Sequence, residues 1–187
     1  MILAPEQSDV RYYQPHGGAV EMFECTDPEV LFEGPAGTGK TFAVCNYILA
    51  FCEAFPGCRV LMLRKERRSL TETVLVTWED KVLPSNHPAR QGPRRSHRDA
   101  YHFPNGSEIV CGGMDNPLKV MSGEYDLIVC FEATGFFESD WEQLTTRLRN
   151  GMAPYQQIIA DCNPEGPSHW LNQRANKGLM TRILPRS

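Results

Sequence analysis

The sequence of 187 residues lacks several features, and each absence excludes a class of protein. No apolar run is long enough to span a bilayer, so we expect no membrane partner. Residues 1–9 lack the basic start and the apolar core of a signal peptide. Internal repeats and low-complexity segments are also missing. The length and the ordinary composition are typical of one soluble domain with a full core, and we assign residues 1–187 to it.

Paired cysteines and an excess of positive charge are missing as well. The seven cysteines include no C-x-x-C pair, so a zinc site is not expected. Several lie in apolar segments, where a free cysteine packs as a small hydrophobe, and their odd number indicates a reducing, cytosolic setting. The net charge is −4, so any contact with nucleic acid must come from a local basic patch.

One complete phosphate-binding motif is present. Every fixed position of the pattern G-x-x-x-x-G-K-[ST] is filled by the run Gly34, Pro35, Ala36, Gly37, Thr38, Gly39, Lys40 and Thr41. A short apolar strand over 29–33 leads into the loop, and an apolar helix over 42–55 leads out of it. We expect Lys40 to reach the β- and γ-phosphates of ATP, and the Thr41 hydroxyl to hold Mg²⁺. The alternative, a glycine-rich turn that binds nothing, is disfavoured by the complete match in the right context.

Strands and helices alternate along the rest of the chain, which predicts an α/β fold with a mostly parallel sheet, of the P-loop NTPase type. The Asn105-Gly106 turn makes residues 101–111 a β-hairpin inserted on this sheet. Ser69-Leu70-Thr71-Glu72 has the form of a capping box and predicts the start of a helix that ends near Pro84. The remaining expected strands cover 59–63, 125–133, 156–164 and 180–184, and the remaining helices cover 18–24, 139–148 and 169–174.

Basic and aromatic residues around the loop are further candidates for ligand contacts. Arg64 directly follows the strand over 59–63, and ligands of open α/β sheets bind beyond the carboxyl ends of strands. Upstream of the loop, Tyr13 and Gln14 have the chemistry to stack on an adenine and to hydrogen-bond its edge. A surface strap that packs its tyrosines on the core explains the same residues equally well.

A polar loop over 85–99 is dense in arginine. Such a loop on a net acidic protein is a candidate for backbone-phosphate contacts with DNA, and a solvated surface loop is the alternative. Its arginines are Arg90, Arg94, Arg95 and Arg98.

A strand that ends in an acidic residue is expected beside the phosphate-binding loop. The apolar strand 127–131 runs directly into Glu132, whose carboxylate can polarise an attacking water. The position before it, where such NTPases often carry an aspartate for the Mg²⁺ shell, is Phe131. The shell must then rely on Thr41, waters, and either Asp126 or Asp161 from nearby strand ends.

Several segments together resemble the ATPase half of the large terminase subunit of tailed bacteriophages. The most specific part is Glu-Ala-Thr at 132–134, followed by Trp-Glu-Gln-Leu-Thr-Thr-Arg-Leu-Arg at 141–149. The segments, in order, are 34–41, 63–65, 125–134, 140–150 and 160–164.

The resemblance implies an ATP-driven motor that moves double-stranded viral DNA into a procapsid in the cytoplasm of the infected bacterium. It also implies a homo-oligomeric ring on the portal protein and a terminase small subunit as partner. Gln14 would belong to the adenine-side motif and Glu132 would be the catalytic glutamate. Residues 161–164, which include the candidate nucleotide contact Asn163, would couple hydrolysis to movement. Lys119 matches the basic residue that reaches a neighbouring subunit's ATP.

Two other hypotheses stay open from the sequence. A RecA-like helicase or translocase shares the phosphate loop and the glutamate, although the order of the later motifs favours a terminase. A nucleotide-binding module with little turnover is suggested by Phe131. Terminases also carry a nuclease domain, and because none follows by Ser187 we expect the chain to be a fragment.

Overall fold

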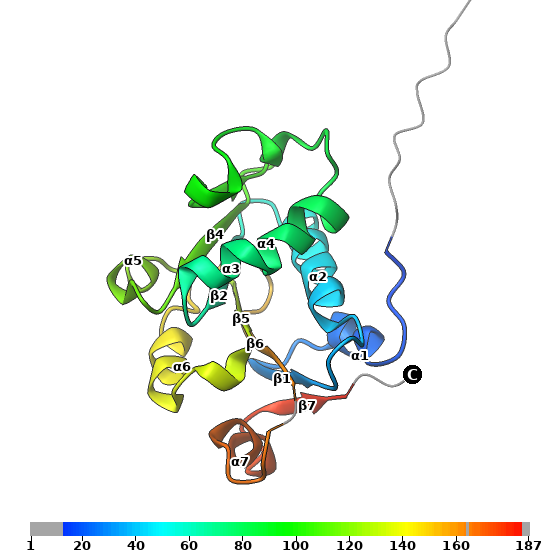
Figure 1. Ribbon diagram of the computed structural model, residues 1–187, viewed down its shortest axis with the longest axis vertical. Helices are drawn as coiled ribbons and strands as arrows, with labels where there is room; N and C mark the ends of the chain where they lie inside the picture. The colour runs from blue at the N-terminus through cyan, green and yellow to red at the C-terminus, as the bar shows by residue number, and fades with distance from the viewer. Residues whose placement is uncertain (1–12, 164, 185–187) are drawn as a thin grey trace, which may run out of the picture.

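The computed structural model describes residues 13–163 and 165–184 as a seven-stranded sheet covered by helices on both faces (Figure 1). The strand order is β3-β4-β2-β5-β6-β1-β7, and every neighbouring pair is parallel except β3 with β4. The strands are β1 (Glu29–Glu33), β2 (Arg59–Arg64), β3 (Ala100–His102), β4 (Glu108–Gly113), β5 (Leu127–Phe131), β6 (Gln157–Cys162) and β7 (Thr181–Ile183).

The helices form two layers with a hydrophobic core beneath each. The first layer packs on one face of the sheet and contains α1 (Gly18–Glu24), α2 (Lys40–Ala54), α3 (Arg67–Glu72), α4 (Val74–Thr77) and the π-helical turn η1 (Trp78–Val82). The second layer covers the other face and contains α5 (Pro117–Met121), α6 (Glu138–Thr145) and α7 (Trp170–Asn176). Short 3₁₀ turns complete the structure as η2 (Pro88–Arg90), η3 (Arg95–His97) and η4 (Ala133–Gly135).

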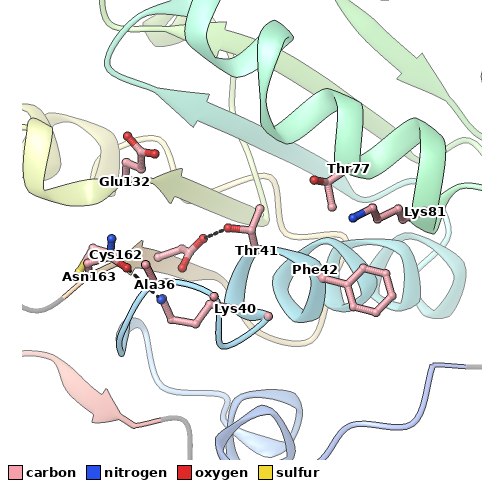
Figure 2. A pocket seen from close by; sticks show the side chains of 12 residues that line it. Ala36, Lys40, Thr41, Phe42, Thr77, Lys81, Glu132, Cys162 and Asn163 are labelled. Atoms are coloured by element: carbon pink, nitrogen blue, oxygen red, sulfur yellow. Dashed lines mark hydrogen bonds between the residues drawn. The ribbon is translucent and has the colours of Figure 1, made fainter.

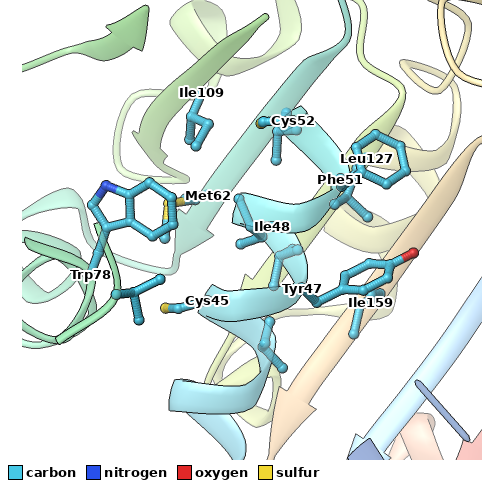
Figure 3. Close-up of a cluster of buried hydrophobic side chains, with 14 of the residues drawn as sticks. Cys45, Tyr47, Ile48, Phe51, Cys52, Met62, Trp78, Ile109, Leu127 and Ile159 are labelled. Carbon is cyan, nitrogen blue, oxygen red and sulfur yellow. The ribbon is translucent and has the colours of Figure 1, made fainter. Parts of the chain in front are cut away.

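The central strands are continuously apolar because both of their faces are buried. In β5, Val129 and Phe131 face the core under α2, while Ile128 and Cys130 face the core under α6. Figure 3 shows part of the first core, where Trp78 packs close to residues of α2 and β2. This alternation also determines which strand-end residues face the phosphate loop and its helix.

Most of the expected elements are confirmed. The α/β class and the parallel sheet are as predicted, and the 101–111 hairpin forms. Its second strand, β4, is a full member of the sheet because it pairs in parallel with β2 over six residues. The helix α5 is not among the helices predicted from the sequence.

The predicted capping box is wrong. Helix α3 begins at Arg67, so Ser69 lies inside the helix and its carbonyl accepts a hydrogen bond from the Thr73 hydroxyl at 2.7 Å. The helical path breaks at Thr73, resumes as α4 and widens into η1, where the Leu83 amide donates to the Trp78 carbonyl at 2.7 Å. A Ser-x-x-Glu spacing inside a helix matches the capping pattern by chance, because the pattern does not test the backbone conformation of its first residue.

The structure also shows the state of the cysteines and the character of the helices. All seven cysteines are free, and six of them are buried. None of the helices in the described part of the chain combines the length and the apolar character that a membrane crossing requires.

Candidate functional site

The phosphate-binding motif forms a loop between β1 and α2 and lines a cavity of about 340 Å³. Gly37 and Gly39 have φ of 80° and 77°, a left-handed backbone that residues with side chains adopt only under strain. The loop therefore curls into the start of α2, whose N-terminus points its free amides and its positive dipole end at the cavity. The cavity is lined by Ala36, Gly37, Gly39, Lys40, Thr41, Phe42, Thr77, Lys81, Glu132, Asp161, Cys162 and Asn163 (Figure 2).

Lys40 is folded under the loop. Its ammonium donates to the carbonyl oxygens of Gly34 at 2.6 Å and Pro35 at 2.8 Å, and to the Asn163 side-chain oxygen at 3.1 Å. The last contact joins the loop to the end of β6 (Figure 2). These three acceptors already use the hydrogen-bonding capacity of the ammonium, so a bound phosphate must compete with them for it.

Asp161 lies directly against Thr41. The Thr41 hydroxyl donates to Asp161 Oδ2 at 2.9 Å, whereas Asp161 Oδ1 is buried and has no hydrogen-bond partner in the described part of the chain. Burial raises the pKa of Asp161 to about 6, although the hydrogen bond from Thr41 and the charges of Lys40 and Arg64 act to lower it. A buried carboxylate with an unused acceptor is costly unless something pairs with it.

Asp126 lies at the wrong end of the sheet for a metal ligand, so this alternative of the prediction is wrong. It precedes β5, whereas Glu132 follows the same strand at the carboxyl end. Its carboxylate is fully buried and accepts five hydrogen bonds that tie together the amino ends of the strands. The donors are the backbone amides of Arg59, Met152 and Ala153 and the side chains of Asn150 and Gln156. The residue before a strand and the residue after it lie at opposite edges of the sheet, so Asp126 and Glu132 cannot serve the same site.

Glu132 stands at the rim of the cavity in an unusual backbone conformation. Its φ is 49° and its ψ is 55°, and it is the non-glycine residue with positive φ in the described part of the chain. The side chain is 71% exposed and forms an ion pair with Arg64, whose own side chain is 10% exposed. Arg64 also donates to the Ser69 carbonyl at 3.2 Å and the Thr73 hydroxyl at 2.6 Å. Such local strain is typical of residues held in place for a function.

The comparison with known families decides which family has this arrangement. A family model described as phage terminase large subunit matches residues 28–179. The chain belongs to the phage terminase large-subunit family. A search of curated proteins finds no match.

Solved structures of large terminases share the fold. The large terminase of the thermophilic bacteriophage D6E matches with a TM-score of 0.72 and 17% identity, over 91% of this chain and 46% of that one. The ATPase domain of the Thermus phage P74-26 large terminase matches with a TM-score of 0.58 and 19% identity, over 82% of this chain and 66% of that one. The HK97 bacteriophage large terminase matches with a TM-score of 0.56 and 11% identity, over 89% and 37%. This chain thus spans less than half of the D6E and HK97 proteins.

Gln14 and Lys119, both predicted for the site of this terminase-family chain, are not among the residues that line the cavity. Gln14 is exposed. The ring of its neighbour Tyr13 packs edge-on against Phe42, and Phe42 is a residue of the cavity lining. Lys119 lies on α5 and pairs with Asp99. It borders a separate cavity of about 200 Å³ beyond the end of β4, with β2, β5 and β6 lying between β4 and β1 in the sheet.

The arginine-rich loop is largely tied to the protein. Arg98 is 5% exposed and donates to the carbonyl oxygens of Ala89, Arg90 and Gln91 at 3.2, 2.7 and 3.0 Å. Its interpretation as a DNA contact is therefore wrong. Arg90 donates to two carbonyls and Arg95 faces acidic side chains, which leaves Arg94 as the exposed arginine of the loop.

Thr77 and Lys81 line the cavity although, like Phe42, they were not predicted as site residues. Thr77 and Lys81 come from α4 and η1 and form a wall across the cavity from the start of α2 (Figure 2). Their spacing of four places them on one helical face, but a polar stripe at that spacing usually marks a solvated surface. Only the packing of the buried face shows that this stripe points at the nucleotide loop.

Proposed function

We propose that this chain is the ATP-hydrolysing motor domain of a phage terminase large subunit, which drives double-stranded DNA into a procapsid. The observation that carries the proposal is the cavity itself, in which a complete phosphate-binding loop faces the exposed carboxylate of Glu132. Membership of the family supports it. The D6E large terminase, whose fold this chain shares, has also been solved in complex with ADP and with ATP-gamma-S.

The loop supplies the nucleotide contacts in this proposal. Backbone amides of the run Gly34–Thr41 would surround the phosphates, and Lys40 would exchange its contacts with Gly34 and Pro35 for phosphate oxygens. Asn163, which now accepts from Lys40, lies where it can respond to that exchange. Gln14 is the adenine-side candidate by family resemblance, and its neighbour Tyr13 contacts Phe42, a residue of the cavity lining.

The side chains beside the loop fit Mg²⁺, which neutralises charge on the phosphates when it is bound. The Thr41 hydroxyl and Asp161 are the protein groups that would hold it, because the unpaired Oδ1 of Asp161 is an acceptor that needs a partner. Within the described ranges no cluster of three or more acidic, histidine or cysteine side chains could hold a metal by itself. Mg²⁺ bound here would keep several waters and share its shell with the nucleotide.

The register of the sheet explains how Asp161 can replace the missing aspartate at Phe131. Phe131 on β5 lies directly opposite Asp161 on β6. Phe131 and Ile159 lie in the core under α2, and Asp161 shares the face of Ile159 because side chains two apart in a strand point the same way. The carboxylate expected on one strand is thus available from the neighbouring strand, one strand nearer to Thr41.

Glu132 is the proposed general base. Its carboxylate would accept a proton from a water whose oxygen attacks the γ-phosphorus while the bond to the β–γ bridging oxygen breaks, releasing ADP and phosphate. Arg64 is a positioning residue for this carboxylate, which it holds by the ion pair. Because Arg64 is also fixed by Ser69 and Thr73, the pair places Glu132 at the cavity without a contribution from another chain.

The assembly in this proposal follows from the family. A homo-oligomeric ring on the portal protein, with a terminase small subunit, would act in the cytoplasm of the infected host. Lys119 would then serve a neighbour's site, since it lies outside the cavity of its own chain. Turnover per chain should rise with protein concentration, and Lys119→Ala should remove that rise without weakening nucleotide binding.

Two variants test the proposed function. Lys40→Ala should abolish ATP binding measured by calorimetry, and Glu132→Gln should bind ATP but hydrolyse it roughly 10²-fold more slowly. Wild-type protein that binds ATP without measurable turnover at any concentration, alone or with DNA, would favour the nucleotide-binding module instead. Unchanged ATP affinity in Lys40→Ala would exclude both functions.

A further inference from the structure

We propose that Lys81 is a second cation of the nucleotide site and contacts the polyphosphate from the wall opposite the loop. The proposal rests on the nucleotide-binding function and adds to it a residue outside every motif in the sequence. It assigns to the helical wall formed by α4 and η1 a direct role in holding the ligand.

Packing determines which way this wall faces. Trp78 is fully buried, and Val74, Leu75 and Val82 are also buried in the core between the wall, α2 and the sheet. That apolar face cannot rotate without exposing Trp78. The opposite polar face, with Thr77 and Lys81 one helical turn apart, is therefore held toward the cavity that the phosphate loop lines.

The acidic neighbours of Lys81 are occupied elsewhere. Glu79 accepts a hydrogen bond from the Tyr101 hydroxyl at 2.7 Å and lies 3.5 Å from Arg95 and 3.8 Å from Arg98. Asp80 lies 3.8 Å from Arg95. Lys81 itself is exposed and has no ion pair or side-chain hydrogen bond within residues 13–163 and 165–184.

The charges on the cavity wall point to an anionic ligand at Lys81. Glu132, one of the acids that line the cavity, pairs with Arg64, and Asp161 accepts from Thr41 through Oδ2 while its other oxygen, Oδ1, is the proposed ligand of Mg²⁺. The ammonium of Lys40 is engaged by three acceptors. Among the described lining residues, Lys81 is thus the cation without an acceptor, and its side chain extends from the wall toward the cavity (Figure 2). A nucleoside triphosphate carries several negative charges, and its phosphate oxygens are acceptors to which the ammonium of Lys81 can donate.

The other end of the same wall lies next to the ion pair between Arg64 and Glu132. Thr73 directly precedes α4, at the point where the helical path breaks, and its hydroxyl accepts a hydrogen bond from Arg64 at 2.6 Å. Arg64 in turn holds Glu132. A phosphate contact at Lys81 would tie this wall to the ligand at the end opposite Arg64.

The test measures nucleotide affinity in the full chain by calorimetry, with ATP-gamma-S, ADP and AMP as probes. Lys81→Ala should weaken binding of ATP-gamma-S by roughly ten-fold, the value of about one charge-assisted hydrogen bond, and of AMP by less than two-fold. Lys81→Arg, which keeps the charge, should restore most of the affinity. The matched control is Lys177→Ala, which removes an exposed lysine at the end of α7, outside the cavity, and should change no affinity.

Three results would overturn the proposal. Lys81→Ala could bind ATP-gamma-S within two-fold of the wild type, it could lose affinity for AMP and ATP-gamma-S equally, or Lys177→Ala could weaken binding as much. In each case Lys40→Ala still abolishes binding if the proposed function is right, so failure at Lys81 is distinguished from failure of the nucleotide site. Equal thermal midpoints for wild type and Lys81→Ala would show that the affinity change is not caused by unfolding.

Discussion

The two ends of the central sheet each bury an aspartate, and the surroundings of the two carboxylates differ. At the amino end, Asp126 accepts five hydrogen bonds, three of them from backbone amides. At the carboxyl end, Asp161 accepts one hydrogen bond, from Thr41, and leaves a buried oxygen without a partner. Both side chains are almost completely buried, so exposure does not distinguish them.

The difference separates a structural carboxylate from one that is ready for a ligand. A buried charge with all its acceptor positions filled is part of the fold, and removing it leaves its donors unsatisfied. A buried charge with an unused oxygen is held in place by the fold at a cost in stability, which a cation can offset. By this criterion the amino end of the sheet holds the chain together and the carboxyl end carries the proposed nucleotide site.

The largest effect is expected from Asp126→Ala. Three backbone amides would lose their acceptor, so the variant should lose about 3–5 kcal/mol of unfolding free energy, measured by urea denaturation. The fraction that stays folded should bind ATP as the wild type does. A loss of ATP affinity in folded protein at unchanged stability would reverse the assignment of the two ends.

Asp161→Asn should have the opposite profile. The amide keeps the size of the side chain and its oxygen can still accept from Thr41, so stability should change by less than about 1 kcal/mol. Removing the charge should weaken Mn²⁺ binding to the nucleotide complex by roughly 10- to 100-fold, the scale seen when metal-site partners are removed.

Electron paramagnetic resonance of free Mn²⁺ in the presence of ADP measures that affinity without any turnover. Asp126→Asn is the matched control and should leave the Mn²⁺ affinity of the folded protein unchanged. Equal Mn²⁺ affinity in Asp161→Asn and wild type would show that another group replaces the aspartate missing at Phe131.

The contrast also shows which parts of the site could be predicted from sequence. The phosphate loop is predictable because its eight residues are contiguous and its glycines are required by the backbone itself. Glu132 is predictable because it ends an apolar strand. The choice between Asp126 and Asp161 is not, because it depends on which strands are neighbours and on the register that places Phe131 opposite Asp161. Lys81 could not be predicted for a related reason, because it is the burial of Trp78 that turns the helical face of Lys81 toward the phosphate-binding loop.

The arginine-rich loop offers the same comparison between two positively charged side chains, Arg98 and Arg94. The smallest effects are expected from substitutions in this loop. Arg98 resembles Asp126 in that its two terminal nitrogens donate to the carbonyls of Ala89, Arg90 and Gln91, while its buried Nε lies 3.8 Å from Glu79 without a hydrogen bond in the described part of the chain. Arg94 is exposed, as a side chain that contacts DNA phosphates must be. Arg98→Ala should therefore lower the unfolding free energy by about 2 kcal/mol, because those carbonyls lose their donor.

Arg94→Ala should leave stability unchanged and weaken binding to double-stranded DNA by a few-fold, in a way that does not depend on sequence. One lost phosphate contact should reduce the slope of log affinity against log salt by about 1, measured by fluorescence anisotropy across a salt series. Lys177→Ala, at the end of α7, removes an exposed cation outside this loop and serves as the control.

A salt slope that is the same in Arg94→Ala and wild type would mean that the loop is only a solvated surface. The DNA contacts of the proposed motor would then have to come from other basic residues. If Arg98→Ala lowers the slope instead while stability is unchanged, engagement by backbone carbonyls does not mark a structural arginine, and the comparison between the two kinds of charge fails.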